Sequence, residues 1–185
     1  MILPNTPCLV RIIEMARISA YVIEKFRNKM IQLYQIQGIE RFWLHPISYH
    51  IDDKLRVSLF YPESVSLYEL LHSDGDSNLR KILQTESNHT RNRIKYEIAF
   101  QLAKILLTIH SLDSIHQHGH LSSHNVFVTI SKVESGTFEI KVKISDIETM
   151  DFMEYGNMFF NYRIASVWSS PEILSNIKKL PKLTP

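Results

Sequence analysis

The sequence has little of several features that would place a chain outside the ordinary globular proteins. Among its 185 residues there is a single cysteine, Cys8, so no disulfide can form within the chain, which suits a reducing compartment. The formal net charge is only +2, too small to indicate a nucleic-acid or anionic-membrane partner. No stretch approaches the roughly eighteen uninterrupted apolar residues that a membrane-spanning helix needs.

The N-terminal residues also lack the pattern of a signal peptide. The stretch MILPNTPCLVRII holds two prolines and has no basic region followed by a long apolar run. The hydrophobic content of 44% and the charged content of 22% are ordinary for a globular protein. A chain of 185 residues is long enough to bury a core, and one domain is the default. We therefore expect a soluble cytoplasmic protein that does not insert into membranes.

Hydrophobic periodicity and residue type predict both strands and helices. Short runs rich in β-branched and aromatic residues predict strands at 8–15, 42–52, 54–63, 125–130 and 137–144. Helical spacing of apolar residues predicts helices at 20–37, 66–72 and 93–112. The polar stretch 73–92 is expected to be a loop, and 131–136 the turn of a hairpin. Two further ordered segments are expected at 155–163 and 168–174, before a tail at 176–185 that frays.

Two helices carry additional signals. In the helix at 93–112, apolar residues recur one turn apart, and alanines and a leucine widen this stripe: Ile94, Ile98, Ala99, Leu102, Ala103, Ile105, Leu106 and Ile109. The helix at 66–72 has Ser66 as its expected N-cap and Glu69 three residues later, which is the capping-box arrangement. Because strands and helices are segregated rather than strictly alternating, the order predicts an α+β fold and argues against a doubly wound parallel sheet.

Five of the nine histidines fall between positions 110 and 124, which raises the hypothesis of a metal site: His110, His116, His118, His120 and His124. On a strand, the alternating His116, His118 and His120 would share one face, and imidazole is a good ligand for zinc or copper. However, Gln117 and Gly119 between them are poor strand formers, and no cysteine or carboxylate lies nearby at metal spacing. A histidine-cluster metal-binding module is therefore one alternative.

A second hypothesis explains more of the residues in this region. After the long helix come HGHLSSHN, a hairpin that ends in SDIE, and then WSSPE. In this order and spacing, these pieces resemble the catalytic loop, metal-binding triplet and segment end of the protein kinase family, H-R-D-L-x-x-x-N, D-F-G and A-P-E. The matching positions are His118, Leu121 and Asn125 in the loop, Asp146 in the triplet, and Pro171 and Glu172 at the end. Trp168 is typical of the tyrosine-kinase-like group.

The resemblance extends over nearly the whole chain. VRIIEM resembles the family's third strand, EKFRNKMIQLYQI its αC helix, and LFYPESVSLYELL the strand, hinge and short helix that follow. It implies an α+β, two-lobed protein-kinase-like fold in residues 1–185. Residues 1–64 would form a small-lobe remnant and hinge, and residues 65–185 part of the large lobe. The glycine-loop strands and the later large-lobe helices would be lacking.

Several positions depart from the family's chemistry. The catalytic Asp, which accepts the substrate hydroxyl's proton, is replaced by His120, and the loop Lys that stabilises the transferring phosphoryl group is replaced by Ser122. The third-strand Lys and its αC partner Glu would align with Ile13 and Lys29. The resemblance implies that these losses remove phosphotransfer.

Two further positions differ in the loop and in the triplet. Gly119 replaces the Arg that pairs with a phosphorylated activation loop, so control through that pair is not expected. Glu148 replaces the glycine of the metal triplet, which removes backbone freedom and would bring a negative charge close to where phosphates sit. No glycine-rich phosphate-binding loop is found.

Asn125 and Asp146 are retained, and in the family these two side chains carry Mg²⁺ bound to ATP. Alternatively, both residues have structural roles, in which Asn125 holds the loop backbone together and Asp146 caps a turn. The resemblance thus implies a catalytically inactive pseudokinase that acts as a scaffold for other signalling proteins, with Mg-ATP as its candidate ligand and no certain cofactor. A partial sequence of a divergent active kinase, which phosphorylates Ser, Thr or Tyr residues, is the alternative beside the metal-binding module.

Overall fold

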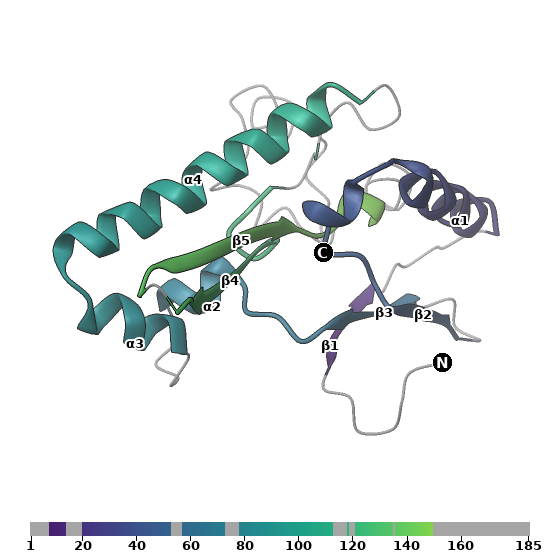
Figure 1. The fold of residues 1–185 in the computed structure, drawn as a ribbon. Coiled ribbons are helices and arrows are strands. Elements are labelled where there is room, and N and C mark those ends of the chain that lie inside the picture. The colour runs from purple at the N-terminus through teal and green to yellow at the C-terminus, as the bar shows by residue number, and fades with distance from the viewer. Residues whose placement is uncertain are drawn as a thin grey trace, which may run out of the picture.

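The computed structural model describes residues 8–13, 20–52, 57–72, 78–112, 118, 121–134 and 136–149. These residues form two antiparallel sheets and four α-helices, so the predicted α+β class is confirmed (Figure 1). The expected segments at 155–163, 168–174 and 176–185 lie outside the described residues. Among the helices of the described part, none is long and apolar enough to cross a membrane.

The first sheet has three strands in the order β1-β3-β2, with β1 at Cys8–Ile13, β2 at Ser48–Ile51 and β3 at Val57–Pro62. Both pairings with the central strand β3 are antiparallel. Every second residue of β3 is buried, namely Val57, Leu59 and Tyr61. This period of two is what a strand with one face on the core requires.

Helix α1 at Ala20–Gln35 has one buried apolar face. Its residues recur about one helical turn apart: Val22, Phe26, Met30 and Leu33. The ring of Phe26 contacts Tyr49 of β2 edge-on, with 5.4 Å between ring centroids. The predicted extension to residue 37 is not found. Gly38 lies beyond the helix with a φ of 80°, a conformation that glycine adopts without strain, and it caps the 3₁₀ turn η1 at Ile39–Arg41.

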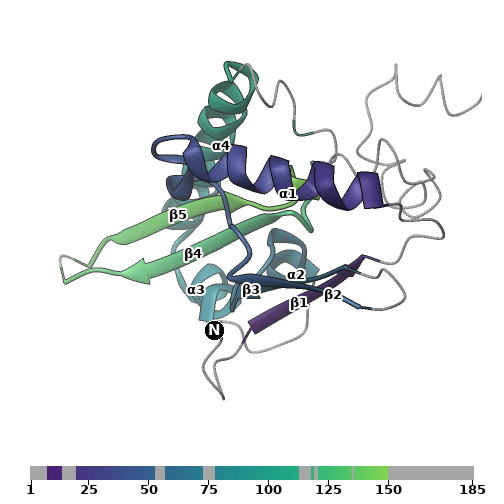
Figure 2. The ribbon, with the colours of Figure 1, turned by 90° about the vertical axis from the view of Figure 1, so that its right-hand side faces the viewer.

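The second sheet is a hairpin of β4 at Val126–Lys132 and β5 at Phe138–Ile144, as the sequence predicts. The long helix α4 at Asn88–His110 packs against β5 (Figures 1 and 2). Its Gln101 side chain donates to the Ile140 carbonyl at 2.8 Å and accepts from the Val142 amide at 3.1 Å. The buried face of α4 holds Ile94, Ile98, Ile105 and Ile109, whereas Ala99 and Ala103, expected on the same stripe, are exposed.

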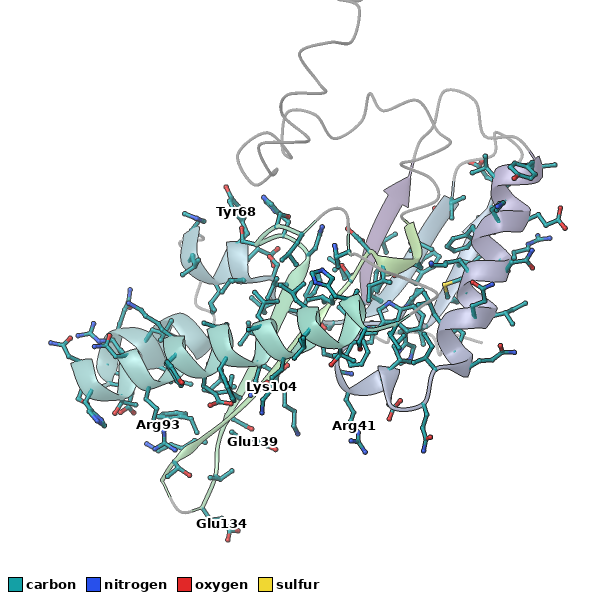
Figure 3. The ribbon with its side chains drawn as sticks, turned by 90° about the horizontal axis from the view of Figure 1, so that it is seen from above. Arg41, Tyr68, Arg93, Lys104, Glu134 and Glu139 are labelled. Carbon is teal, nitrogen blue, oxygen red and sulfur yellow. The ribbon has the colours of Figure 1, made fainter. Side chains whose placement is uncertain are left out.

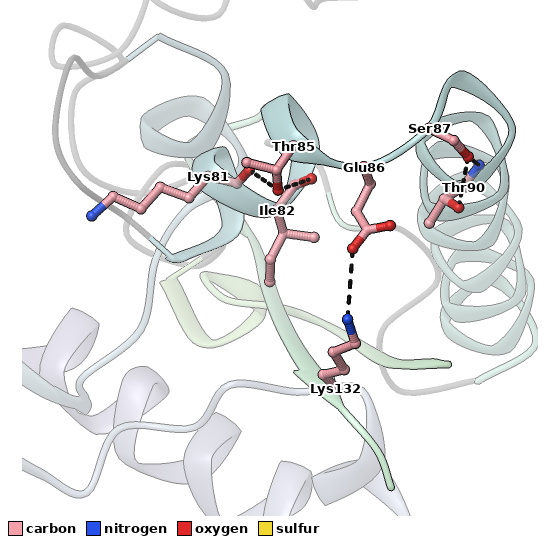
Figure 4. Close-up of polar contacts among 7 residues, drawn as sticks. All are labelled: Lys81, Ile82, Thr85, Glu86, Ser87, Thr90 and Lys132. Carbon is pink, nitrogen blue, oxygen red and sulfur yellow. Dashed lines mark hydrogen bonds and ion pairs between the residues drawn. The ribbon is translucent and has the colours of Figure 1, made fainter. Parts of the chain in front are cut away.

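The prediction of a loop at 73–92 is wrong for the part that the structure describes. Helix α3 occupies Asn78–Thr85, and α4 begins at Asn88 with Ser87 as its N-cap. The Ser87 hydroxyl accepts from the Thr90 amide at 3.2 Å, and Glu86 between the two helices pairs with Lys132 of β4 at 3.8 Å (Figure 4). A capping serine in a polar stretch therefore starts a helix here.

Helix α2 at Leu67–His72 has the predicted capping box. The Ser66 amide donates to Glu69 Oε2 at 3.0 Å, and the Glu69 amide donates to Ser66 Oγ at 3.1 Å. Each of these bonds satisfies a backbone N–H that the helix itself leaves unpaired. The prediction at this position is confirmed.

The predicted strand at 42–52 is shortened, because its first residues pair with the other sheet. Trp43 forms an isolated parallel bridge to Ile144 at the end of β5. The Ile144 amide donates to the Phe42 carbonyl, and the Leu44 amide donates to the Ile144 carbonyl, both at 2.8 Å. The segment between α1 and β2 thus connects to the β4-β5 hairpin, and buried residues of both sheets belong to one hydrophobic core.

Candidate functional site

The candidate site lies where the loop before β4 meets the segment after β5. The Asn125 amide donates to the Ser122 carbonyl at 3.0 Å, which closes a tight turn before β4 begins. The Ser145 amide donates to the Asn125 carbonyl at 2.9 Å. Asn125 directly precedes β4 and Ser145 directly follows β5, so this bond holds Asn125 next to the residue before Asp146.

His118 holds the same junction from the other side. Its ring is 2% exposed, and Nε2 lies 2.7 Å from the Ser145 carbonyl oxygen. Because a carbonyl oxygen only accepts hydrogen bonds, Nε2 carries the proton and donates. His118 therefore positions Ser145, the residue before Asp146.

Asp146 stands in an uncommon backbone conformation with a φ of 71°. A left-handed conformation costs roughly 1 kcal/mol for a residue with a Cβ, although aspartate tolerates it better than most. Its side chain is 1% exposed, and Oδ1 accepts from the Ser145 hydroxyl at 3.3 Å. The turn at Asp146 ends β5 and starts the 3₁₀ turn η2 at Ile147–Thr149.

Glu148, in η2, is completely buried among aromatic residues that are distant in sequence. The indole Nε1–H of Trp43 donates to Glu148 Oε2 at 2.9 Å, and the Tyr61 hydroxyl donates to Glu148 Oε1. Burial raises the pKa of Glu148 to about 7, and the charge of Asp146 adds to the rise, while the two donors oppose it. The sequence led us to expect a negative charge close to where phosphates would sit. Instead, the carboxyl group is held inside the protein by these two donors.

The rings of Tyr34 and His45 extend this aromatic enclosure around Trp43. Tyr34 lies 5.3 Å and His45 lies 5.6 Å from Trp43, measured between ring centroids. Partial burial and the negative charge of Glu148 raise the pKa of Tyr34. Burial, together with the charge of Lys143, lowers the pKa of His45, so His45 is neutral near pH 7.

The other predicted positions are less informative. Ser122 is buried, and its Oγ has no hydrogen-bond partner among the described residues, so it offers a small hydroxyl where the family has a lysine. Ile13 ends β1, opposite Val57, and Lys29 lies on α1, where it lines an open hollow of about 250 Å³ with Lys25. Five positions of the kinase resemblance lie outside the described residues: Gly119, His120, Trp168, Pro171 and Glu172.

The donor atoms at Asn125 and Asp146 are of a kind that Mg²⁺ accepts, namely an amide oxygen and a carboxylate. Their surroundings fit the ion less well, because the two side chains are 0% and 1% exposed and face protein rather than an open cleft. The neighbouring carboxyl of Glu148 is already bound by Trp43 and Tyr61. The arrangement suits holding the chain together better than gripping a nucleotide.

Sequence reasoning missed the partners of Glu148. Trp43 and Tyr61 each carry a polar group on a large apolar body, and such groups find a hydrogen-bond partner when they are buried. From this rule we can expect that Trp43 has an acceptor, but we cannot tell which residue provides it, because Glu148 lies 105 positions away in the chain. In the part of the chain described by the structure, no group of three or more His, Cys, Asp or Glu residues can hold a metal ion. His116 and His120 lie outside that part.

Models of known protein families give no match to this chain, and no curated protein is significantly similar to it.

Proposed function

We propose that this chain is a catalytically inactive, kinase-like scaffold that acts in the cytoplasm by binding other signalling proteins. The order of its elements supports the proposal. A strand, a helix and two strands (β1, α1, β2, β3) stand where the family has its third strand, its αC helix and the strands that lead to the hinge. The short helix α2, the long helix α4 and the hairpin β4-β5 follow in the family's order, with the catalytic-loop equivalent between α4 and β4.

The observation that carries the proposal is the buried carboxyl of Glu148 at the third position of the metal triplet. Hydrogen bonds to Trp43 and Tyr61 fix this side chain on the side of the first sheet. A kinase triplet must hold its Asp toward Mg²⁺ and the nucleotide phosphates. Here the two residues after Asp146 are in a 3₁₀ turn and buried, so the segment is fixed by packing instead.

The active-kinase alternative retains one favourable observation. The Ser145–Asn125 backbone bond and the His118–Ser145 contact place the two metal-ligand equivalents at one junction. A divergent kinase could use this junction if Glu148 left its buried position. That movement would break two buried hydrogen bonds and leave the Trp43 and Tyr61 donors without their acceptor.

Transfer of radiolabelled phosphate from Mg-ATP to generic protein substrates tests the proposal. We expect no transfer by the full chain above the level of a chain with Asp146→Ala. Transfer that the Asp146→Ala substitution abolishes would overturn the proposal and support the active-kinase alternative.

A further inference from the structure

Helix α4 has a second apolar stripe on the face opposite to the one it buries. Tyr96, Phe100 and Leu107 are 69%, 42% and 72% exposed, and the exposed Ala99 and Ala103 lie between them. These five residues, the α4 outer stripe, follow one another at intervals of one, three or four and therefore share one side of the helix. A helix that is apolar on two opposite sides is normally covered on both.

The shape of the α4 outer stripe suits the docking of a second helix. The rings of Tyr96 and Phe100 are nearly parallel, with 6.1 Å between centroids and 10° between planes, and form a ridge near the start of the stripe. Ala99 and Ala103 form a low row beside this ridge, and Leu107 closes it. The stripe is about 17 Å long, and a row of small residues beside a ridge lets a second helix approach to roughly 8–10 Å between axes.

Basic side chains flank the outer stripe. Lys104 lies over the Phe100 ring, with Nζ 4.3 Å from its centroid, and Arg93 lies on the same edge of α4 (Figure 3). Lys95 lies at the other edge by its helical position. The one acidic residue of α4, Glu97, accepts a hydrogen bond from Gln101 at 2.8 Å. Within the described part of the chain, no carboxylate pairs with Arg93 or Lys95.

We propose that the α4 outer stripe binds an amphipathic helix of another protein, whose apolar face is bordered by acidic side chains. Anchors at helical spacing would fill the row between the Tyr96–Phe100 ridge and Leu107, and carboxylates would meet Arg93, Lys95 and Lys104. The inference deepens the proposed scaffold function by stating the chemistry of a partner. Its physical basis is α4 alone, and it does not require the kinase resemblance.

Charge argues against two other occupants of the α4 outer stripe, namely a second copy of the chain and residues 150–185 of the chain itself. A second copy of the chain would bring the basic edges of one α4 against those of the other, which is repulsive. Residues 150–185 carry four basic and three acidic side chains and thus lack the negative border that the stripe would attract. An acidic amphipathic helix complements both the shape and the charge.

Binding of two synthetic helical peptides to the full chain, followed by fluorescence anisotropy, tests this inference. Both peptides carry leucines at positions i, i+3, i+4 and i+7, and they differ only in having glutamates or lysines at the borders. We expect the glutamate peptide to bind roughly tenfold more tightly, and this preference to shrink as salt is raised. The double substitution Tyr96→Ser with Leu107→Ser should weaken binding of the glutamate peptide by about tenfold.

Matched variants and a solution measurement complete the test. Ile31→Ser on α1, where Ile31 is 56% exposed, should leave peptide binding unchanged. The double substitution Lys95→Glu with Lys104→Glu should reverse the preference between the peptides. Equal binding of the two peptides, or insensitivity to the Tyr96 and Leu107 substitutions, would overturn the inference. So would a dimer that Leu107→Ser dissociates, or protection of Tyr96 from hydroxyl-radical labelling in the monomeric chain. Phosphotransfer by the chain would overturn the inactive-scaffold proposal while leaving the peptide result standing.

Discussion

The indole Nε1–H of Trp43 donates a hydrogen bond of 2.9 Å to Oε2 of Glu148, which lies 105 positions later in the chain. This bond joins the segment before β2 to the turn after β5. With the Tyr61 hydroxyl on the other carboxylate oxygen, it connects the three-stranded sheet to the end of the hairpin. Glu148, which in the proposed kinase resemblance stands at the glycine of the metal triplet, is therefore a central polar contact of the fold.

Glu148→Ala should destabilise the protein strongly, because it removes the acceptor of two buried donors and leaves a cavity. We expect a loss of about 2–4 kcal/mol in the free energy of unfolding, measured by urea denaturation at pH 6. Glu148→Gln should cost much less, since its amide oxygen accepts from Trp43 and its amide N–H₂ can donate to the Tyr61 oxygen. Equal losses for the two variants would contradict this expectation, because glutamine fills the same space and can keep both hydrogen bonds.

Stability should depend on pH through Glu148. Its pKa is raised from an ordinary 4.5 to about 7 in the folded chain, so between these values the folded state binds more protons than the unfolded state. The free energy of unfolding therefore falls as pH rises from about 4.5 to about 7, by roughly 3 kcal/mol for this group alone.

Urea denaturation at a series of pH values checks this dependence. Glu148→Gln cannot titrate, and its stability curve should be flatter than that of the unsubstituted chain over the same range. Parallel curves for the two proteins would contradict the raised pKa.

Much of the fold was predictable because its signals are local. A run of β-branched and aromatic residues indicated β3, the one-turn spacing of Ile94, Ile98, Ile105 and Ile109 indicated α4, and Ser66 with Glu69 marked the start of α2. These patterns arise from one face of one element, so a single sequence contains them.

The features that the sequence did not predict depend largely on contacts between distant parts of the chain. The segment at Phe42–Leu44 is apolar like a strand, but it pairs with Ile144 of the hairpin rather than extending β2. Helix α3 has an apolar face, because Leu79, Ile82 and Leu83 recur at helical spacing, and Ile82 and Leu83 pack against the core. The helix is short, however, and the polar residues around it favour a loop. The contact of Glu148 with Trp43 and Tyr61 has no local signal, because hydrogen-bond partners far apart in a chain do not mark each other in the sequence.

The two faces of α4 predict effects of very different size for substitutions two residues apart. Ile109→Ala removes a fully buried side chain and should cost about 2–4 kcal/mol of stability. Leu107→Ala removes a side chain that is 72% exposed and should change stability by less than about 0.5 kcal/mol. Thermal unfolding followed by circular dichroism compares the pair. A large loss from Leu107→Ala would mean that the α4 outer stripe is already covered within the chain.

Mg-ATP should leave the melting temperature unchanged at millimolar concentrations, because the side chains of Asn125 and Asp146 are buried and face protein. Asp146→Asn serves as the matched control, since it keeps the shape of the side chain and removes its charge. A rise in melting temperature that Asp146→Asn abolishes would show that the junction binds the metal-nucleotide complex after all.

The most direct measurement of the central claim is phosphate transfer from Mg-ATP by the full chain with the single substitution His120→Asp. Under the proposed kinase resemblance, this change would restore the catalytic base, whereas Ser122 would still stand in place of the lysine that clamps the transferring phosphoryl group. Glu148 would still accept its buried hydrogen bond from Trp43. We expect no transfer above the level of the unsubstituted chain. Transfer at about 1–100 s⁻¹, the rate typical of kinases, would contradict it by showing that the rest of the machinery is intact.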